Sequence, residues 1–286
     1  MKEALEFLKS LYPNKKIEVL SKLPGGMMNK SFVVLIDNKK YVLYLPTKQA
    51  NEMVDRGLEK ENQKIVYDLD ITSKNLYFDS TTGIKLNEYL EGSSLNNLSN
   101  DEIDIKKVAK LLKTLQNSPI LSKKDYKPFE RLVKFEKEKE EMNITDLKEY
   151  NTLRNCVFDH RSFLENEKKV LSHNDFQKSN IVKSNNEYFV IDFEFMMNNY
   201  QTYDIACYGN GDVKDGYDLL CAYFINPSKE QIKRYYLWRI FVSLQWYNVA
   251  LIKNKRGEGL VHNIDFYEVA KFFLENAKEA YSKLID

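Results

Sequence analysis

The first ninety residues of the chain contain short apolar runs separated by polar, turn-forming stretches, a pattern typical of β-strands. The strands predicted from these runs cover residues 17–20, 31–36, 41–45, 76–78 and 83–89. Residues 37–40 predict the turn of a hairpin. Apolar positions spaced three and four residues apart predict a short helix over residues 4–11 and a longer one over 51–69. We therefore expect a small antiparallel sheet that carries one main helix.

Helical spacing replaces the strand pattern after Gly92. An apolar stripe with the spacing i, i+3, i+4 and i+7 is formed by Val108, Leu111, Leu112 and Leu115. Ser99 or Asn100 is the expected N-cap of this helix, because both side chains can accept a hydrogen bond from a backbone N–H of the first turn.

Most of the remaining chain is also expected to be helical. Residues 123–169 are rich in Lys and Glu and predict solvated helices, with residues 136–141 as an exposed helix face. Residues 229–284 predict two or three further helices. The chain is thus expected to be an α+β protein, with a sheet-bearing part over residues 1–90 and a helical part over 91–286.

The amino-acid composition and net charge limit the kinds of molecule that the protein is expected to bind. The 286 residues are 43% hydrophobic and 30% charged, which predicts a folded core. Lys plus Arg number 43 and Asp plus Glu 42, giving a formal net charge of +1 that argues against a nucleic-acid partner bound through bulk charge. No run approaches the ~20 apolar residues of a membrane span, so no membrane insertion is expected. The acidic N-terminus does not fit a signal peptide, and three cysteines cannot all pair; we expect a cytoplasmic protein.

One segment carries residues suited to phosphoryl transfer. It reads H-x-D-x4-N from His173 to Asn180, and residues 191–194 follow as Ile-Asp-Phe-Glu. Phosphoryl transfer needs a carboxylate that holds the acceptor hydroxyl and metal ions that bridge the nucleotide phosphates. Asp175 is the candidate carboxylate. Asn180 and Asp192 are the candidate oxygen ligands of Mg2+, a hard cation.

The spacing of the two candidate ligands has a structural reason. Residues 180–183 and 187–192 predict two strands, and residues 184–186 predict the turn that joins them. Such a hairpin would return Asp192 close to Asn180. The alternative is a chance H-x-D triplet before an ordinary hairpin, and the matching position of Asn180 and of the Ile-Asp-Phe-Glu segment argues against it.

These motifs resemble those of the choline and ethanolamine kinases. The resemblance rests on H-N-D-x4-N, on Ile-Asp-Phe-Glu, and on residues 199–206, and it extends from about Leu23 to about Trp246. It is closest to the bacterial choline kinases that decorate lipopolysaccharide and teichoic acid. Glu194 follows Asp-Phe where protein kinases have Gly. The resemblance implies a protein-kinase-like fold with two lobes: a nucleotide-binding lobe over residues 1–90 with a small antiparallel sheet, and a larger, mainly helical catalytic lobe over residues 91–286.

On the nucleotide side, the resemblance implies roles for several residues of the first lobe. Residues 23–31 resemble the family's phosphate loop, and the hinge that binds adenine corresponds to residues 88–92. The implied nucleotide-binding residues are Gly25, Gly26, Asn29, Lys30, Glu59, Glu88 and Leu90. In the family, a helix glutamate, here Glu59, pairs with a basic residue on the third strand. This chain has Tyr44 at that position, so the positive charge must come from elsewhere, with Lys30 and Lys48 as candidates.

On the acceptor side, the resemblance implies an aromatic pocket. Choline is a quaternary ammonium that donates no N–H hydrogen bond, so proteins bind it with aromatic faces and carboxylates. The implied substrate-binding residues are Gln177, Glu194, Tyr200, Tyr203 and Trp246. For Trp246 the alternative is a core position. Asp204 is expected to brace the catalytic loop by hydrogen bonds.

The function implied is that of a Mg2+- and ATP-dependent choline kinase that releases phosphocholine and ADP. Two alternatives stay open. The first is the same chemistry on another small amino alcohol, namely ethanolamine, thiamine or an aminoglycoside. The second is a nucleotide-binding pseudokinase, which Tyr44 suggests because its side chain supplies no fixed positive charge.

Overall fold

The computed structural model describes residues 1–23 and 29–285. Contacts divide the chain into two compact units, each built from two stretches of sequence. The first unit combines Met1–Leu98 with Ile181–Phe195, and the second combines Ser99–Asn180 with Met196–Asp286. The division differs from the single boundary after residue 90 that the sequence suggested, because the segment after Asn180 groups with the N-terminal residues.

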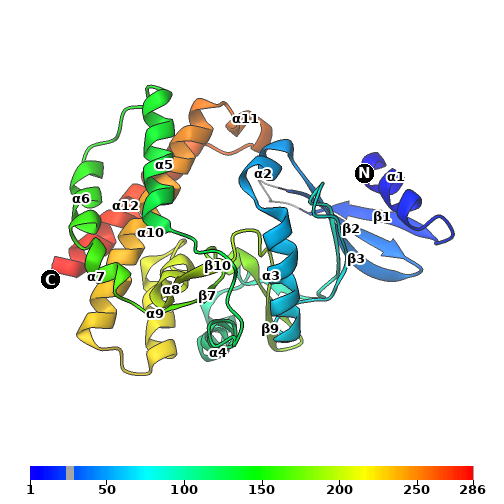
Figure 1. The fold of residues 1–286 in the computed structure, drawn as a ribbon, viewed down its shortest axis with the longest axis horizontal. Coiled ribbons are helices and arrows are strands. Elements are labelled where there is room, and N and C mark those ends of the chain that lie inside the picture. The colour runs from blue at the N-terminus through cyan, green and yellow to red at the C-terminus, as the bar shows by residue number, and fades with distance from the viewer. Residues whose placement is uncertain (24–28, 286) are drawn as a thin grey trace. The chain divides into compact units, whose positions relative to one another are not determined.

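The first unit contains a five-stranded antiparallel sheet with the strand order β1-β2-β3-β5-β4. Its strands are β1 (Ile17–Lys22), β2 (Asn29–Ile36), β3 (Lys39–Pro46), β4 (Asn75–Phe78) and β5 (Lys85–Glu88). All five predicted strands are therefore present. One face of the sheet packs against helix α1 (Lys2–Leu11, Figure 1), whose Ala4 and Leu8 are buried in the same apolar cluster as Phe32 and Leu43. The predicted small antiparallel sheet is confirmed.

The main helix predicted over residues 51–69 is instead two helices, α2 (Lys48–Met53) and α3 (Arg56–Asp68). The break falls at Val54, which is extended, and at Asp55, whose side chain accepts a hydrogen bond from the N–H of Leu58 at 3.0 Å. The Asp55 carboxylate thereby caps a new helix and competes with continuation of the preceding one. As a result, Arg56 and Glu59 lie in the first turn of α3.

A second, three-stranded sheet of the first unit joins its two stretches of sequence. Strand β8 (Ile181–Ser184) pairs on one side with β6 (Ser93–Ser94) and on the other with β9 (Glu187–Val190). Asn185 and Asn186 form the hairpin turn with φ of 47° and 67°, the left-handed values that a two-residue turn between twisted strands requires. This confirms the predicted hairpin. Asn180 directly precedes it in the second unit, and Asp192 follows it in the first unit.

The second unit is mainly helical. Its helices are α4 (Ile105–Gln116), α5 (Pro128–Glu141), α6 (Tyr150–Asp159), α7 (Arg161–Glu165), α8 (Gln201–Tyr208), α9 (Val213–Phe224), α10 (Lys229–Lys255), α11 (Gly259–His262) and α12 (Phe266–Ile285). Two short strands, β7 (Lys169–Ser172) and β10 (Met197–Tyr200), pair with each other. Helix α10 lies along α12 and also contacts α5 and α8 (Figure 1), and Trp238 in its middle is fully buried. This long helix forms the centre of the unit's core.

Two local predictions for this unit were wrong. Ser99 does not cap the helix that carries the stripe; with Glu102 it caps a single 3-10 turn at Asn100–Glu102. The cap of α4 is Asp104, whose carboxylate accepts hydrogen bonds from the N–H groups of Lys106 and Lys107 at 3.0 and 3.3 Å. Asp104 reaches two N–H donors of the first helical turn, which makes it the better cap.

The Lys/Glu-rich face of α5 also differs from the exposed surface that was expected. Lys139 is 3% exposed, its Nζ lies 4.1 Å from the centre of the Tyr150 ring, and its ammonium pairs with Asp146. Glu136 accepts hydrogen bonds from the Tyr150 hydroxyl and from Arg154, both at 2.7 Å. The ammonium of Lys139 lies over the ring of Tyr150 from α6 and the ring of Tyr247 from α10, so part of this charged run faces inward.

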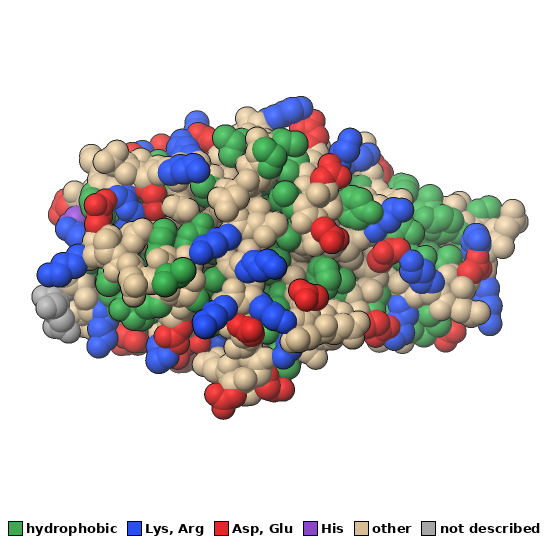
Figure 2. Space-filling model, turned by 90° about the horizontal axis from the view of Figure 1, so that it is seen from below, with side chains coloured by type: hydrophobic (Ala, Val, Ile, Leu, Met, Phe, Trp, Pro, Cys, Tyr) green, Lys and Arg blue, Asp and Glu red, His purple; other side chains and the backbone are tan. Residues whose placement is uncertain are grey.

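The surface shown in Figure 2 carries basic, acidic and apolar side chains intermixed. This mixture agrees with the near-zero formal net charge of the chain. None of the helices in the described residues is long and apolar enough to cross a membrane.

Candidate active site

The segment predicted to be the catalytic loop belongs to the second unit and follows strand β7. Its backbone is held by Asp204 of α8, whose two carboxylate oxygens accept hydrogen bonds from the N–H groups of His173 and Asn174 at 2.9 and 2.8 Å. Asp204 is 0% exposed. Burial raises its pKa to about 6, and the two backbone hydrogen bonds oppose that rise. The predicted bracing role of Asp204 is confirmed.

The structure brings Asp175, Gln177 and Asn180 together on this loop. Oδ2 of Asp175 accepts hydrogen bonds from Nε2 of Gln177 at 3.1 Å and from Nδ2 of Asn180 at 2.8 Å. Nδ2 of Asn180 also donates to the backbone carbonyl of Asp175 at 2.9 Å. These contacts fix the plane of the carboxylate. Because the amide nitrogen of Asn180 is directed at Asp175, the amide oxygen is the atom that can coordinate a cation.

A chain of hydrogen bonds connects the loop to the core helix α10. Oε1 of Gln177 accepts from Nδ2 of Asn210 at 3.4 Å, and Oδ1 of Asn210 accepts from Nη1 of Arg239 at 2.8 Å. Arg239 is fully buried and also donates to the carbonyl of Ala206. Sequence reasoning missed Arg239. A single arginine inside the apolar stretch around Trp238 was the signal, because a buried arginine requires polar partners.

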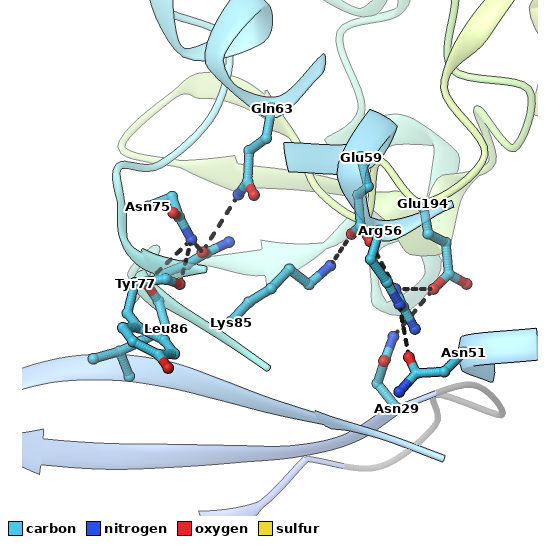
Figure 3. A network of polar contacts seen from close by, with 11 residues as sticks. Asn29, Asn51, Arg56, Glu59, Gln63, Asn75, Tyr77, Lys85, Leu86 and Glu194 are labelled. Atoms are coloured by element: carbon cyan, nitrogen blue, oxygen red, sulfur yellow. Dashed lines mark hydrogen bonds and ion pairs between the residues drawn. The ribbon is translucent and has the colours of Figure 1, made fainter. Parts of the chain in front are cut away.

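The first unit holds a separate buried cluster of charged side chains, defined by Arg56, Glu59, Lys85, Asp192 and Glu194. Figure 3 shows Arg56, Glu59, Lys85 and Glu194 of this cluster. Glu59 accepts from Nζ of Lys85 and, at 2.7 Å, from Nη1 of Arg56. The same Arg56 nitrogen lies 3.6 Å from Oε2 of Glu194. The guanidinium of Arg56 thus links the carboxylate of Glu59 on α3 with that of Glu194, which follows strand β9.

Two asparagines, Asn29 and Asn51, form hydrogen bonds with members of this charged cluster. Nδ2 of Asn29, at the start of β2, donates to Oε2 of Glu194 at 3.3 Å. Nε of Arg56 donates to Oδ1 of Asn51 at 2.9 Å (Figure 3). Asn29, Glu59 and Glu194, which the sequence assigned to nucleotide or acceptor binding, are therefore brought together.

The partner of Glu59 is Lys85 of β5, which sequence reasoning did not single out. In the β3–β5 pairing Tyr44 lies directly opposite Lys85, whose Nζ is 5.1 Å from the centre of the Tyr44 ring. Lys30, one of the two expected substitutes, is instead exposed beside Glu3, and Lys48 is exposed at the start of α2. The register of β3 with β5 decides this pairing, and no local sequence pattern gives that register.

Asp192 fits a cation ligand on two observations. Its Oδ1 is buried and has no hydrogen-bond partner among the described residues. In addition, three carboxyl groups of the charged cluster face only two basic side chains, Lys85 and Arg56. Burial raises the pKa of Asp192, Lys85 lowers it, and Glu59 adds to the rise. A divalent cation would supply the missing positive charge at an oxygen that has no donor.

The excess of carboxyl groups also affects Glu194. Burial, followed by the nearby Asp192, raises its pKa to about 8, and Lys85 opposes that rise. Glu194 therefore lies among charged groups of the first unit, and its predicted contact with the acceptor stays a prediction.

The remaining nucleotide-side predictions concern four residues outside the charged cluster. Gly25 and Gly26 lie outside the described residues. Glu88 ends β5 and pairs with the exposed Lys39 at 2.5 Å, while Leu90 follows the strand and is half-buried.

The aromatic residues predicted for the acceptor side are divided between two clusters of the second unit. Tyr200 stacks on Trp238 with ring centres 5.5 Å apart, and Tyr203, which is 0% exposed, meets the same indole edge-on at 5.2 Å. Trp246 stacks on Phe273 of α12 at 6.1 Å. Tyr203 and Tyr200 therefore contribute to the core around Trp238, and Trp246 contributes to the contact between α10 and α12.

Comparison with known proteins identifies relatives along nearly the whole chain. A family model described as choline/ethanolamine kinase matches residues 20–271. The LicA protein of Haemophilus influenzae is 24% identical over 256 residues, covering 82% of this chain and 73% of the relative.

Solved structures share the fold. The crystal structure of choline kinase LicA from Streptococcus pneumoniae has a TM-score of 0.76 at 23% identity and covers 99% of this chain and 98% of that one. A structure of LicA in complex with AMP has a TM-score of 0.74 at 24% identity and covers 99% and 97%. The α+β, kinase-like fold with an N-terminal antiparallel sheet and a mainly helical remainder is thereby confirmed.

Proposed function

The chain belongs to the choline/ethanolamine kinase family of phosphotransferases, and from this membership we propose that it transfers the γ-phosphate of ATP to the hydroxyl of choline. The observation that carries the proposal is the position of Asp175, held by Gln177 and Asn180 on a loop that Asp204 anchors. The similarity to a choline kinase from Streptococcus pneumoniae favours choline among the amino alcohols.

Asp175 acts on the acceptor. Its carboxylate accepts a hydrogen bond from the choline hydroxyl and takes the proton as the new O–P bond forms and the bond between the γ-phosphorus and ADP breaks. The two hydrogen bonds to Oδ2 orient the carboxylate. Little reorganisation is then needed when the acceptor arrives, because Asp204 and the chain through Asn210 to Arg239 already fix the loop.

Asn180 and Asp192 are the proposed ligands of Mg2+. A bound magnesium ion supplies charge neutralisation of the nucleotide phosphates. The support from this chain is the buried, unpartnered Oδ1 of Asp192 and the excess of carboxyl groups beside it. Of the two ligands Asp192 carries the charge, whereas Asn180 offers a neutral amide oxygen.

Recognition of the trimethylammonium group is assigned, within the same proposal, to Tyr200, Tyr203, Trp246 and Glu194. Trp246 is half-buried, whereas Tyr200 is buried at 7% exposed and Tyr203 is fully covered. Tyr203 donates toward Oε1 of Gln245 at 3.4 Å, so its share in the pocket would be to hold neighbouring groups in place.

A single assay tests the proposed function. ATP consumption is measured without acceptor and with choline, ethanolamine, thiamine or an aminoglycoside, and phosphocholine is identified as the product. We expect saturable turnover that is fastest with choline and is lost without Mg2+. ATP consumption that none of these acceptors increases would support the pseudokinase alternative. Faster turnover on another acceptor would replace choline by that compound.

A further inference from the structure

We infer that Lys85 is the residue that places a positive charge on the nucleotide phosphates, so that this chain supplies the charge from strand β5 instead of β3. The inference rests on the proposed function and deepens it by naming the phosphate-binding cation. The inference also removes the reason for the pseudokinase alternative. That alternative rested on Tyr44, which supplies no positive charge for the phosphates, and Lys85 would supply this charge instead.

The environment of the Lys85 ammonium suits a ligand contact. Lys85 is 3% exposed, and its Nζ lies 5.1 Å from the centre of the Tyr44 ring and 5.8 Å from the centre of the Phe78 ring. Its one hydrogen-bond acceptor among the described residues is Glu59. An ammonium has three N–H donors, so the pair with Glu59 leaves donors for a ligand.

Lys85 also lies beside the proposed metal ligand. Burial lowers the pKa of Lys85, but the carboxylates of Glu59, Asp192 and Glu194 outweigh that effect and raise it, which keeps the side chain positively charged. Glu59 does not depend on Lys85 alone for a basic partner. Here Arg56 already binds Glu59 at 2.7 Å.

The strand register brings the lysine to the place of the missing charge. Tyr44 and Lys85 are directly opposite on neighbouring antiparallel strands, so their side chains leave the same face of the sheet. The strands are only ~4.8 Å apart. A lysine side chain on β5 therefore reaches the space above Tyr44 that a basic residue on β3 would occupy, and the ring of Tyr44 supports its ammonium from one side.

The test separates a phosphate contact from a structural role by comparing ATP with adenosine. Binding of each ligand is measured by calorimetry in the presence of Mg2+ for the wild type and for Lys85→Met. We expect Lys85→Met to lose ~100-fold in ATP affinity, the scale on which removing one partner of a buried charge pair weakens binding, and to bind adenosine within about twofold of wild type. The matched control is Lys15→Met, which removes an exposed lysine paired with Asp37 at 2.5 Å in the same unit and should change neither affinity.

A second variant covers the case in which Lys85→Met does not fold because Glu59 is left buried and unpaired. The double variant with Lys85→Gln and Glu59→Gln removes both charges of the pair. If its preference for ATP over adenosine matches that of the wild type, Lys85 is a structural residue and the inference is overturned. Lys85 is equally a structural residue if a folded Lys85→Met keeps the wild-type preference, or if it loses ATP and adenosine affinity to the same extent.

An exchange of the two opposite residues gives the positive test. In the variant with Tyr44→Lys and Lys85→Tyr the ammonium returns to β3, and we expect ATP affinity at least ~10-fold above that of Lys85→Met. A folded exchange variant with no recovery would contradict the assignment to the ammonium. The binding arms need no acceptor, so they decide the role of Lys85 even if choline is not the substrate. Conversely, wild-type choline turnover together with an unchanged ATP preference in Lys85→Met would remove only this inference.

Discussion

Replacing Asp204 by asparagine should change how the stability of the protein depends on pH. Asp204 is fully buried and has its pKa raised from 3.8 to about 6, mainly by burial. The folded protein therefore holds the Asp204 proton more tightly than the unfolded chain does. The stabilisation from this proton is present in full below pH 3.8 and is lost as the pH rises through about 6.

The size of the effect follows from the same shift. At ~1.4 kcal/mol for each pKa unit, a rise from 3.8 to about 6 corresponds to about 3 kcal/mol, most of which falls between pH 4 and pH 7. Asparagine does not titrate, so its variant lacks this dependence. The amide can accept only one of the two backbone N–H groups of His173 and Asn174 well, which adds a pH-independent loss of ~1–3 kcal/mol.

The assay is urea unfolding of the wild type and of Asp204→Asn at pH 4, 5, 6 and 7. The stability advantage of the wild type should be larger at pH 4 than at pH 7 by ~2–3 kcal/mol. The Asp204 carboxyl resonance, assigned by its loss in the variant, should titrate near pH 6. Parallel stability curves, or a resonance that titrates near the ordinary aspartate value, would refute the reasoning that burial outweighs the backbone hydrogen bonds.

Three further substitutions test the proposed site. Asp175→Asn should fold and bind ATP but lose ~100- to 10,000-fold in turnover, since an amide accepts a proton poorly; turnover within a few-fold of wild type in a steady-state assay would exclude Asp175 as the base. Asp192→Ala should weaken Mg-ATP binding in calorimetry more than Asn180→Ala does, because an anionic oxygen binds Mg2+ more strongly than a neutral one, and equal effects would contradict the assignment of the charged ligand. Trp246→Ala should raise the KM for choline ~5- to 30-fold with little change in the KM for ATP if its indole faces the ammonium; a joint loss of both, or unfolding, would show that the stack on Phe273 is its main role.

The sequence predicted most elements because their signals are local. Short apolar runs marked the five strands of the first sheet, and residues 184–186 marked the turn of the β8–β9 hairpin. The break between α2 and α3 was missed because Asp55 stands inside an otherwise helical apolar pattern, and only its cap of Leu58 reveals the new start. Local patterns can therefore give the type of an element more easily than its ends.

Some residues of the candidate site could be predicted to lie together from the sequence, and others could not. Asp175, Gln177 and Asn180 lie within one loop, so sequence proximity already placed them together. Lys85 was missed because its contact with Glu59 depends on the pairing of two strands that lie far apart in the sequence. Arg239 was missed for a similar reason, since its partner Asn210 belongs to another part of the chain.

The discontinuous first unit has a consequence for how the protein is made. Strand β6 finds its partner β8 only after the chain has been translated past residue 184, and the carboxylates of Asp192 and Glu194 emerge later still. A nascent chain that ends at Leu98 carries Arg56 without Glu194 and β6 without a neighbour. Completion of this unit therefore waits until synthesis of the intervening helices α4 to α7 is finished, and a fragment that ends at Leu98 lacks part of the unit.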